Sequence, residues 1–276
     1  MVQSVIDHLK QRIAKIEGRA ARFTGMDEVR NRPWTLGITE LDAALPYDRS
    51  GQNGLCLDGC HDFTPMAKTD VPQGAGFILA LLQRLPAQRL IKGPVIWCQT
   101  AYNTREYGRI YAPGLLGQAV SPDRFLFVTV PRDRDMALVL EECVRTHCVA
   151  AVVGEGPEPN FTASRRLTLA AQESHVPCLI LNTGGMVGAS AAATRWRIAP
   201  IAGPPDRHDP QGPGHPAWSI TLARSRGADA ALNPTLAKPL KVTWNNATHR
   251  FDLVSAFRSG KPLARPAPHG AFQGQG

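Results

Sequence analysis

The stretch from Leu55 to Leu85 constrains the fold most, because it has the pattern of a strand, a loop and a helix in succession. Residues 55–60 are short, apolar and flanked by glycines, like the first buried strand of a parallel sheet. Residues 76–85 are apolar almost all round and stop before Pro86, which is typical of a core helix. In a nucleotide-binding protein of this layout, the intervening loop would hold the phosphates.

The loop of residues 60–75 lacks most features of a phosphate loop. Such a loop needs glycines that turn backbone N–H groups toward the anion, and then a Lys and a hydroxyl residue at the helix start. Lys68 and Thr69 match the last two positions, but no glycine lies between Gly59 and Gly74, and two prolines remove N–H donors. We predict a helix start near Gly74, which separates Lys68 from the positive end of the helix dipole.

Two interpretations of this loop remain open from the residues. Lys68 is a solvated loop residue in the first. In the second, Gly74 and Gly76 form a crude anion nest at the start of the helix. Neither interpretation provides a complete nucleotide site.

Length and composition indicate a globular protein with a sizeable core, since the chain has 276 residues and is 43% hydrophobic. The net charge of +8 favours acidic partners, among them nucleic acid. The sequence contains no apolar run near the ~18 residues of a membrane span, and its first residues do not resemble a signal peptide. We therefore expect a cytoplasmic protein with no membrane contact.

The six cysteines do not predict a metal site. None belongs to a C-x-x-C pair, and most lie in apolar strand-like runs, where a free cysteine acts as a small hydrophobe. Cys60-His61 and His147-Cys148 are the nearest approach to zinc-ligand pairs. We expect no metal.

Both ends of the chain are predicted to lie outside the main domain. Residues 1–33 are expected to form an N-terminal helix and a polar linker, and the helix has an apolar stripe that includes Val5, Leu9, Ile13 and Ile16. This stripe either packs on its own domain or docks on a partner, and self-association is one form of docking. Residues 258–276 are rich in Gly, Pro and Ala and contain basic residues without an acid, which predicts a disordered basic tail.

Residues 34–257 form the predicted main domain, an α/β fold with a mostly parallel sheet covered by helices. Further strands are expected near residues 94–98, 124–130, 149–153 and 177–181, and they alternate with helices near 104–111, 135–147 and 163–174. The final third alternates apolar and polar residues, which favours antiparallel strands at the C-terminal edge near 196–198, 217–223, 240–244 and 249–253.

Short motifs spread over about residues 34–255 make the chain resemble the ImuA family. In chain order they are Leu36-Gly37-Ile38, Leu41 through Pro46, Val95-Ile96-Trp97, Ile110 through Leu115, Pro122-Asp123-Arg124, Thr162 through Leu167, Thr194 through Pro200, Leu222 through Gly227 and Trp244 through Phe251. The resemblance implies a RecA-like core and a role in damage-induced translesion DNA synthesis. It also implies partnership with ImuB, an inactive polymerase homologue, with an error-prone polymerase and with RecA.

Compared with a RecA-type ATPase, the sequence departs at its catalytic positions. The phosphate loop is degenerate, the fourth strand ends in Glu155 where an Asp would be expected to hold Mg²⁺, and no Glu follows the second strand at Gln99. Phosphoryl transfer needs all three elements. We therefore predict a non-catalytic protein without ATP or another cofactor. A divergent ATPase that uses Lys68, Thr69 and Glu155 is the alternative.

Arginines supply the candidate contacts to nucleic acid or to an acidic partner. Arg165 and Arg166 open a predicted helix, where like charge meets the positive dipole. Two further pairs at alternate strand positions are expected to cluster near one sheet edge: Arg195, Arg197, Arg224 and Arg226. These residues, and the glycine-rich loop at 182–190 where RecA-like folds hold single-stranded DNA, leave a single-stranded-DNA-binding module as a further alternative.

Overall fold

The structure is a computed structural model that describes residues 34–46, 53–85, 93–117, 120–185, 188–205, 211–212, 214–226 and 238–254. These residues belong to the predicted main domain. The predicted N-terminal helix, with Val5, Leu9, Ile13 and Ile16, and the predicted tail at residues 258–276 lie outside the described residues.

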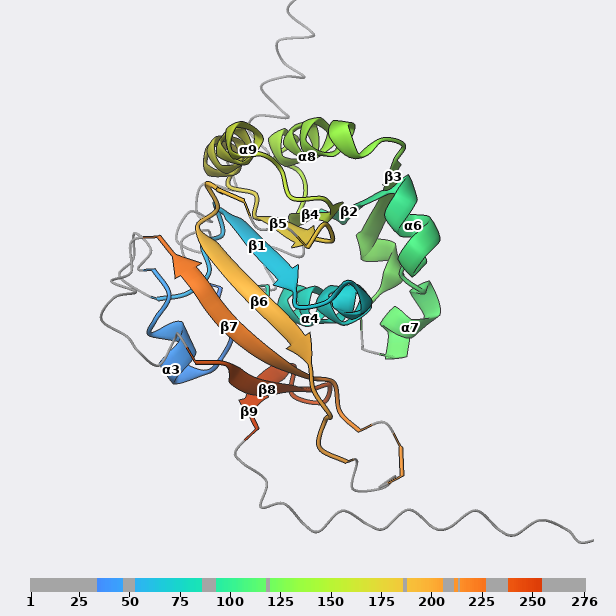
Figure 1. The fold of residues 1–276 in the computed structure, drawn as a ribbon, viewed down its shortest axis with the longest axis vertical. Coiled ribbons are helices and arrows are strands. Elements are labelled where there is room, and N and C mark those ends of the chain that lie inside the picture. The colour runs from blue at the N-terminus through green and yellow to red at the C-terminus, as the bar shows by residue number, and fades with distance from the viewer. Residues whose placement is uncertain are drawn as a thin grey trace, which may run out of the picture.

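One nine-stranded sheet organises this domain (Figure 1), with the order β3-β2-β4-β5-β1-β6-β7-β8-β9. The strands are β1 Cys60–Pro65, β2 Val95–Thr100, β3 Phe125–Val130, β4 Ala151–Gly156, β5 Cys178–Asn182, β6 Thr194–Pro200, β7 Ala217–Ser225, β8 Leu240–Asn245 and β9 Arg250–Leu253. From β3 to β6 the neighbours pair in parallel, and from β6 to β9 they pair antiparallel. The predicted RecA-like α/β fold with antiparallel strands at its C-terminal edge is confirmed.

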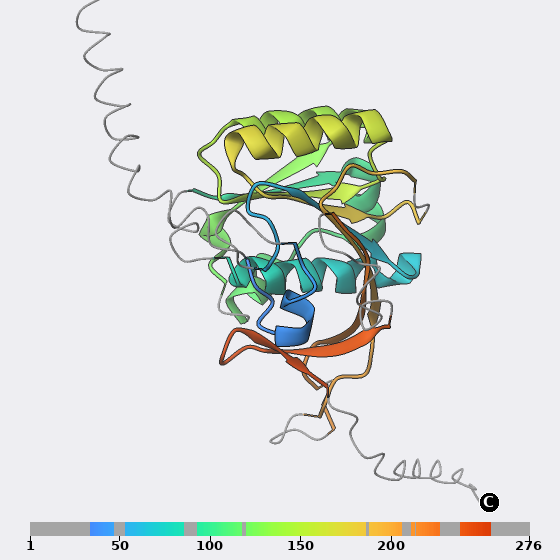
Figure 2. The same cartoon turned by 90° about the vertical axis from the view of Figure 1, so that its left-hand side faces the viewer.

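Helices cover both faces of the sheet (Figures 1 and 2). Helices α8, Met136–Arg145, and α9, Phe161–Ser174, lie side by side on the outer face. Figure 2 shows the sheet curving around α4, Val71–Gln83, which lies on the inner face. Because both faces are covered, every residue of β2, β4 and β5 is buried. The short helices are α3 Thr39–Asp42, α6 Ala101–Tyr107 and α7 Ala112–Gly117.

The inner core forms where aromatic residues of the antiparallel strands meet α4. The Phe77 ring lies 5.5 Å from the Trp218 ring and 5.3 Å from the Phe251 ring, measured between centroids. Trp34 donates an indole hydrogen bond of 2.9 Å to the Leu81 carbonyl, which fixes the start of the domain to α4. Burying each large apolar side chain contributes about 1.5–3 kcal/mol, so this cluster anchors the antiparallel edge on the helix.

The first strand differs from its prediction, because β1 runs over Cys60–Pro65 and not over residues 55–60. His61 and Asp62 have the polar character of a loop, yet both are buried within β1. The His61 ring pairs with Thr194 Oγ1 at 2.8 Å and with the Cys56 carbonyl at 2.9 Å, and Asp62 forms an ion pair with Arg195. Partners distant in sequence therefore allow a polar pair inside a buried strand.

Two further expectations are corrected. Helix α4 begins at Val71, three positions before Gly74, and the 3-10 turn Lys68–Asp70 leads directly into it. Strand β6 pairs antiparallel with β7, as predicted, but it also pairs in parallel with β1, which was not predicted. The predicted β8–β9 hairpin is confirmed, and Asn245 Oδ1 accepts hydrogen bonds from the N–H groups of Ala247 and Thr248 in its turn.

Among the described residues, no helix combines the length and apolar character needed to cross a membrane.

Candidate functional site

The short loop between β1 and α4 occupies the position of a phosphate loop. Lys68 and Thr69 immediately precede the helix, so they lie closer to its positive end than the sequence predicted. Asp70 lies there as well. Its carboxylate accepts 3.1 Å and 3.3 Å hydrogen bonds from the Ala67 N–H and the Thr69 hydroxyl. An acid therefore takes up donors that a phosphate would need, and the Thr69 hydroxyl is already engaged.

The candidate glycines lie inside α4 and do not form an anion nest. A Cβ atom on Gly74 would come within 2.8 Å of Leu181 Cδ1, so the residue allows close packing of α4 on β5. A Cβ atom on Gly76 would lie 3.8 Å from Trp218 Cζ2. The helix starts before both residues and directs their N–H groups along its axis, which disfavours the second of the two interpretations of this loop.

Glu155, at the end of β4, is held by neutral donors from the neighbouring strand. Trp97 Nε1 and Gln99 Nε2 each donate a 3.0 Å hydrogen bond, one to each carboxylate oxygen. Gln99 also donates 2.8 Å to the Gly108 carbonyl, which fixes its amide. Burial raises the pKa of Glu155, and the two hydrogen bonds lower it in part. The carboxylate that would face a metal is therefore hydrogen-bonded within the protein, and Glu155 also lines a pocket of about 260 Å³ together with Pro72, Ala75 and Gly76 of α4.

A buried charge cluster lies at the start of β6. Arg195 forms ion pairs with Asp62 Oδ2, 3.4 Å from its Nε, and with Glu158, which follows β4. Its Nη1 donates 2.6 Å to the Gly188 carbonyl, and Glu158 Oε2 accepts 2.8 Å from the Gly188 N–H. Arg195 thus fixes the loop between β5 and β6 from inside the molecule.

Asp62 is a member of this cluster that sequence analysis missed. It is 3% exposed, and burial raises its pKa to about 6, although the Ser190 hydroxyl and the Arg195 charge act in the opposite direction. The signal was hidden because its partner Arg195 is distant in sequence and the pattern placed residue 62 in a loop. Only the pairing of β1 with β6 brings the two together.

Arg224 and Arg195 are register partners on β7 and β6, so these two predicted arginines do lie on adjacent strands. Arg224 Nη2 donates 2.7 Å and 3.0 Å to the carbonyls of Ser190 and Ala192. Both side chains are therefore engaged with the loop that ends at β6, although Arg224 Nε is buried without a hydrogen-bond partner in the described part of the chain.

The remaining predicted arginines are more accessible. Arg166 forms a 2.6 Å ion pair with Glu141, which ties α9 to α8. Arg165, Arg197 and Arg226 are exposed, and within the described part of the chain their side chains form no hydrogen bond or ion pair. Of the arginines predicted as contacts, these three stay available to an acidic partner or to a nucleic acid.

A pocket of about 370 Å³ lies where the chain leaves β4 and β5. Asn160 caps α9 at its rim by accepting a 2.9 Å hydrogen bond from the Ala163 N–H, and Phe161 next to it is 48% exposed. Gly184 and Gly188 also line the pocket. This pocket includes part of the glycine-rich loop predicted at 182–190. In the described ranges, no set of three His, Cys, Asp or Glu side chains is grouped to hold a metal ion.

The sheet order and the two helical layers define a RecA-like α/β protein. No protein-family model matches the chain. The chain is similar to the ImuA proteins of two strains of Caulobacter vibrioides, with 33% identity over 206 residues that cover 70% of this chain and 78% of each relative. The chain therefore belongs to the ImuA family, as its motifs predicted.

Proposed function

We propose that this protein is a non-catalytic, RecA-like accessory factor of damage-induced mutagenic translesion DNA synthesis in the cytoplasm. In this role it bridges an ImuB-like inactive polymerase homologue, together with an error-prone polymerase, to RecA or DNA. Membership of the ImuA family supports the pathway, and the incomplete phosphate loop supports the lack of catalysis.

The observation that carries the non-catalytic role is the pair of hydrogen bonds that Glu155 accepts from Trp97 and Gln99. Both carboxylate oxygens accept hydrogen bonds from Trp97 and Gln99, and Asp70 adds a negative charge where a phosphate would bind. ATP hydrolysis needs a free metal-binding acid, a phosphate-binding lysine and a positioned water together. A site that lacks one of these groups loses most of its rate.

The position of Lys68 favours one alternative, a divergent ATPase. Lys68 and Thr69 lie immediately before α4, where an ammonium and a hydroxyl contact phosphates in P-loop proteins. In that case Lys68→Ala would abolish nucleotide binding. In the accessory role the same variant behaves as the wild type.

A second alternative is a single-stranded-DNA-binding module. The exposed Phe161 beside the glycine-lined pocket offers a ring on which a base could stack, and Arg165 lies on the next turn of α9. Binding through phosphates would weaken steeply as salt rises, because counterions are released. Affinity that stays flat between low and moderate salt would reject this alternative.

Partner capture tests the bridging role directly. We expect an immobilised ImuB-like protein to retain the full chain, and the double variant Leu9→Asp, Ile13→Asp to lose retention with an unchanged thermal unfolding midpoint. Both residues lie outside the described part of the chain, and the matched control is Lys10→Asp, Lys15→Asp on the opposite face of the predicted helix. Retention of the apolar-face variant would contradict the assignment of the helix.

A further inference from the structure

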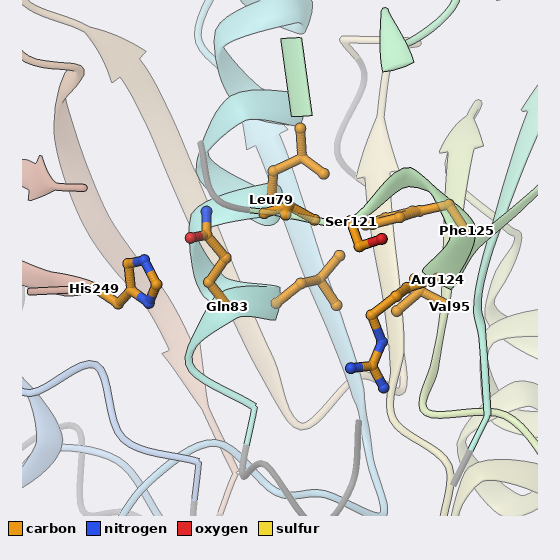
Figure 3. Close-up of a pocket in the computed structure, with 9 residues that line it drawn as sticks. Leu79, Gln83, Val95, Ser121, Arg124, Phe125 and His249 are labelled. Atoms are coloured by element: carbon orange, nitrogen blue, oxygen red, sulfur yellow. The ribbon is translucent and has the colours of Figure 1, made fainter. Parts of the chain in front are cut away.

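A pocket of about 250 Å³ lies at the carboxyl end of α4, remote from the loop that precedes this helix (Figure 3). It is found where β2 and β3 begin, so it lies near the amino ends of these parallel strands. Its walls are apolar and come from α4, from the two strands and from the turn before β3, namely Leu79, Leu82, Val95, Val120 and Phe125.

Gln83 contributes an unmatched polar group to this pocket. Both its amide atoms, Nε2 and Oε1, are buried and form no hydrogen bond in the described part of the chain. Buried amides in native proteins are nearly always paired, so an unpaired one requires a reason. A ligand that supplies one acceptor and one donor would satisfy it, and a peptide group supplies both.

Arg124 contributes an unmatched charge. Its side chain is half-buried, and within the described ranges its guanidinium forms no ion pair or hydrogen bond. Figure 3 shows Arg124 beside Val95 on one side of the pocket and Gln83 beside His249 on the other. An arginine in such a position pairs best with a carboxylate, because its N–H groups match the two oxygens.

The arrangement is that of a ligand site, with an apolar floor and a few convergent polar groups. A purely apolar ligand would fill the walls but would leave Gln83 and Arg124 unpaired. A phosphate alone would pair with Arg124 and leave the floor exposed. A peptide with an apolar side chain next to a carboxylate satisfies all three features, and it complements the net charge of +8.

We propose that this pocket binds a segment of a partner protein in which an apolar residue adjoins a carboxylate. The apolar side chain lies between Leu82 and Phe125, the buried Gln83 amide turns into the pocket to pair with a peptide group of the segment, and the carboxylate pairs with Arg124. The claim that the pocket contacts a partner of a bridging factor rests on the function proposed above. The claim that the pocket binds a peptide can be tested independently of that function.

Methyl NMR of the full chain is the experiment, with N-acetyl-Ala-Leu as the probe and the same dipeptide capped as a C-terminal amide for comparison. We expect the free-carboxylate probe to shift the methyl signals of Leu79, Leu82, Val95 and Val120 in a saturable way. The amide probe should bind about tenfold more weakly, because it lacks the charge that pairs with Arg124.

Arg124→Gln removes the cation from a half-exposed position, so the fold should be retained. We expect this variant to weaken the free-carboxylate probe about tenfold and to leave the amide probe unchanged. Arg165→Gln, which removes an exposed and unpaired cation from α9, is the matched control and should bind both probes like the wild type.

Two results would overturn the assignment. One is the absence of saturable shifts at these methyls with about 10 mM free-carboxylate probe. The other is equal binding of both probes with no effect of Arg124→Gln, which would indicate a nonspecific apolar pocket. If the peptide binds but an ImuB-like protein is not captured, the bridging role is rejected and the assignment of the pocket as a peptide site stands. If an ImuB-like protein is captured but the peptide does not bind, the pocket assignment is rejected and the bridging role stands.

Discussion

The polar groups at the end of β4 have partners within the protein, whereas those at the end of α4 do not have them in the described part of the chain. Glu155 and Glu158, which end and follow β4, each have two or more hydrogen-bond or ion-pair partners. Gln83 and Arg124, by contrast, have unpaired side-chain polar groups in the described part of the chain. The edge where RecA-like proteins bind nucleotide thus has its acids paired within the protein, and unsatisfied binding capacity lies at the other end of α4.

The largest expected effect comes from breaking the ion pairs of Glu158. Arg195→Met leaves the buried carboxylates of Asp62 and Glu158 without their cation, and removing one partner of a buried pair typically costs about 3–5 kcal/mol. Urea unfolding measures the change in the free energy of unfolding. Arg197→Met, an exposed position two residues along the same strand, is the control and should change it by less than about 0.5 kcal/mol. Equal effects of the two variants would show that the cluster does not stabilise the fold.

The raised pKa of Asp62 predicts that the free energy of unfolding depends on pH. Its pKa is raised in the folded state to about 6, so the folded protein holds this proton more tightly than the unfolded chain does. The stability contributed by the protonated form is complete below about pH 4 and is lost as the pH rises to about 6, and two pKa units correspond to about 3 kcal/mol. Between these pH values, wild type should therefore lose stability relative to Asp62→Asn. A pH-independent difference between the two proteins would contradict the raised pKa.

Removing the Glu155 carboxylate is expected to have a smaller effect on stability, and the sign of that effect distinguishes the accessory role from the ATPase alternative. Glu155→Ala leaves Trp97 Nε1 and Gln99 Nε2 without an acceptor, so we expect a loss of about 1–3 kcal/mol in the free energy of unfolding. A carboxylate kept for metal binding would behave differently, since removing an unpaired buried charge stabilises a protein. Stabilisation by Glu155→Ala would favour the ATPase alternative. Glu106→Ala, at an exposed position on α6, is the control.

The smallest effect is expected at the opposite end of α4. Gln83→Met keeps the length of the side chain and removes two buried polar atoms that have no partner, so it should stabilise the free protein by about 1 kcal/mol. The same change should weaken binding of the N-acetyl-Ala-Leu probe. Destabilisation with unchanged probe binding would mean that the amide is satisfied in solution, and it would remove the contrast between the two regions.

Sequence patterns predicted the parts of this structure that local signals determine. Alternating apolar runs located β2 to β5 and α8 and α9, and the Asn245-Asn246 pair marked the turn of the β8–β9 hairpin. The start of β1 was missed because His61 and Asp62 are made compatible with burial by Thr194 and Arg195, far along the chain. The parallel pairing of β6 with β1 was missed for a related reason, since the choice of a neighbouring strand depends on the path of the chain and leaves no local pattern.

The candidate site likewise has features that the sequence predicts and features that only the fold reveals. The shortage of phosphate-loop residues can be read from the sequence itself, because it depends only on which residue types are present. The engagement of Arg195 and Arg224 with their own loop could not, because it depends on carbonyls at Gly188, Ser190 and Ala192 that no spacing rule identifies. The pocket beside Gln83 was also missed, since it joins α4, two strand starts and a hairpin turn that are widely separated in sequence.

Calorimetric titration of the full chain with Mg·ATP tests the central claim most directly. With Glu155 held by Trp97 and Gln99, and with Asp70 beside Lys68, we expect no saturable heat up to about 1 mM nucleotide, and the same result for Lys68→Ala. Saturable binding with a dissociation constant near about 1 μM, lost in Lys68→Ala, would contradict the account and would identify a nucleotide-dependent protein.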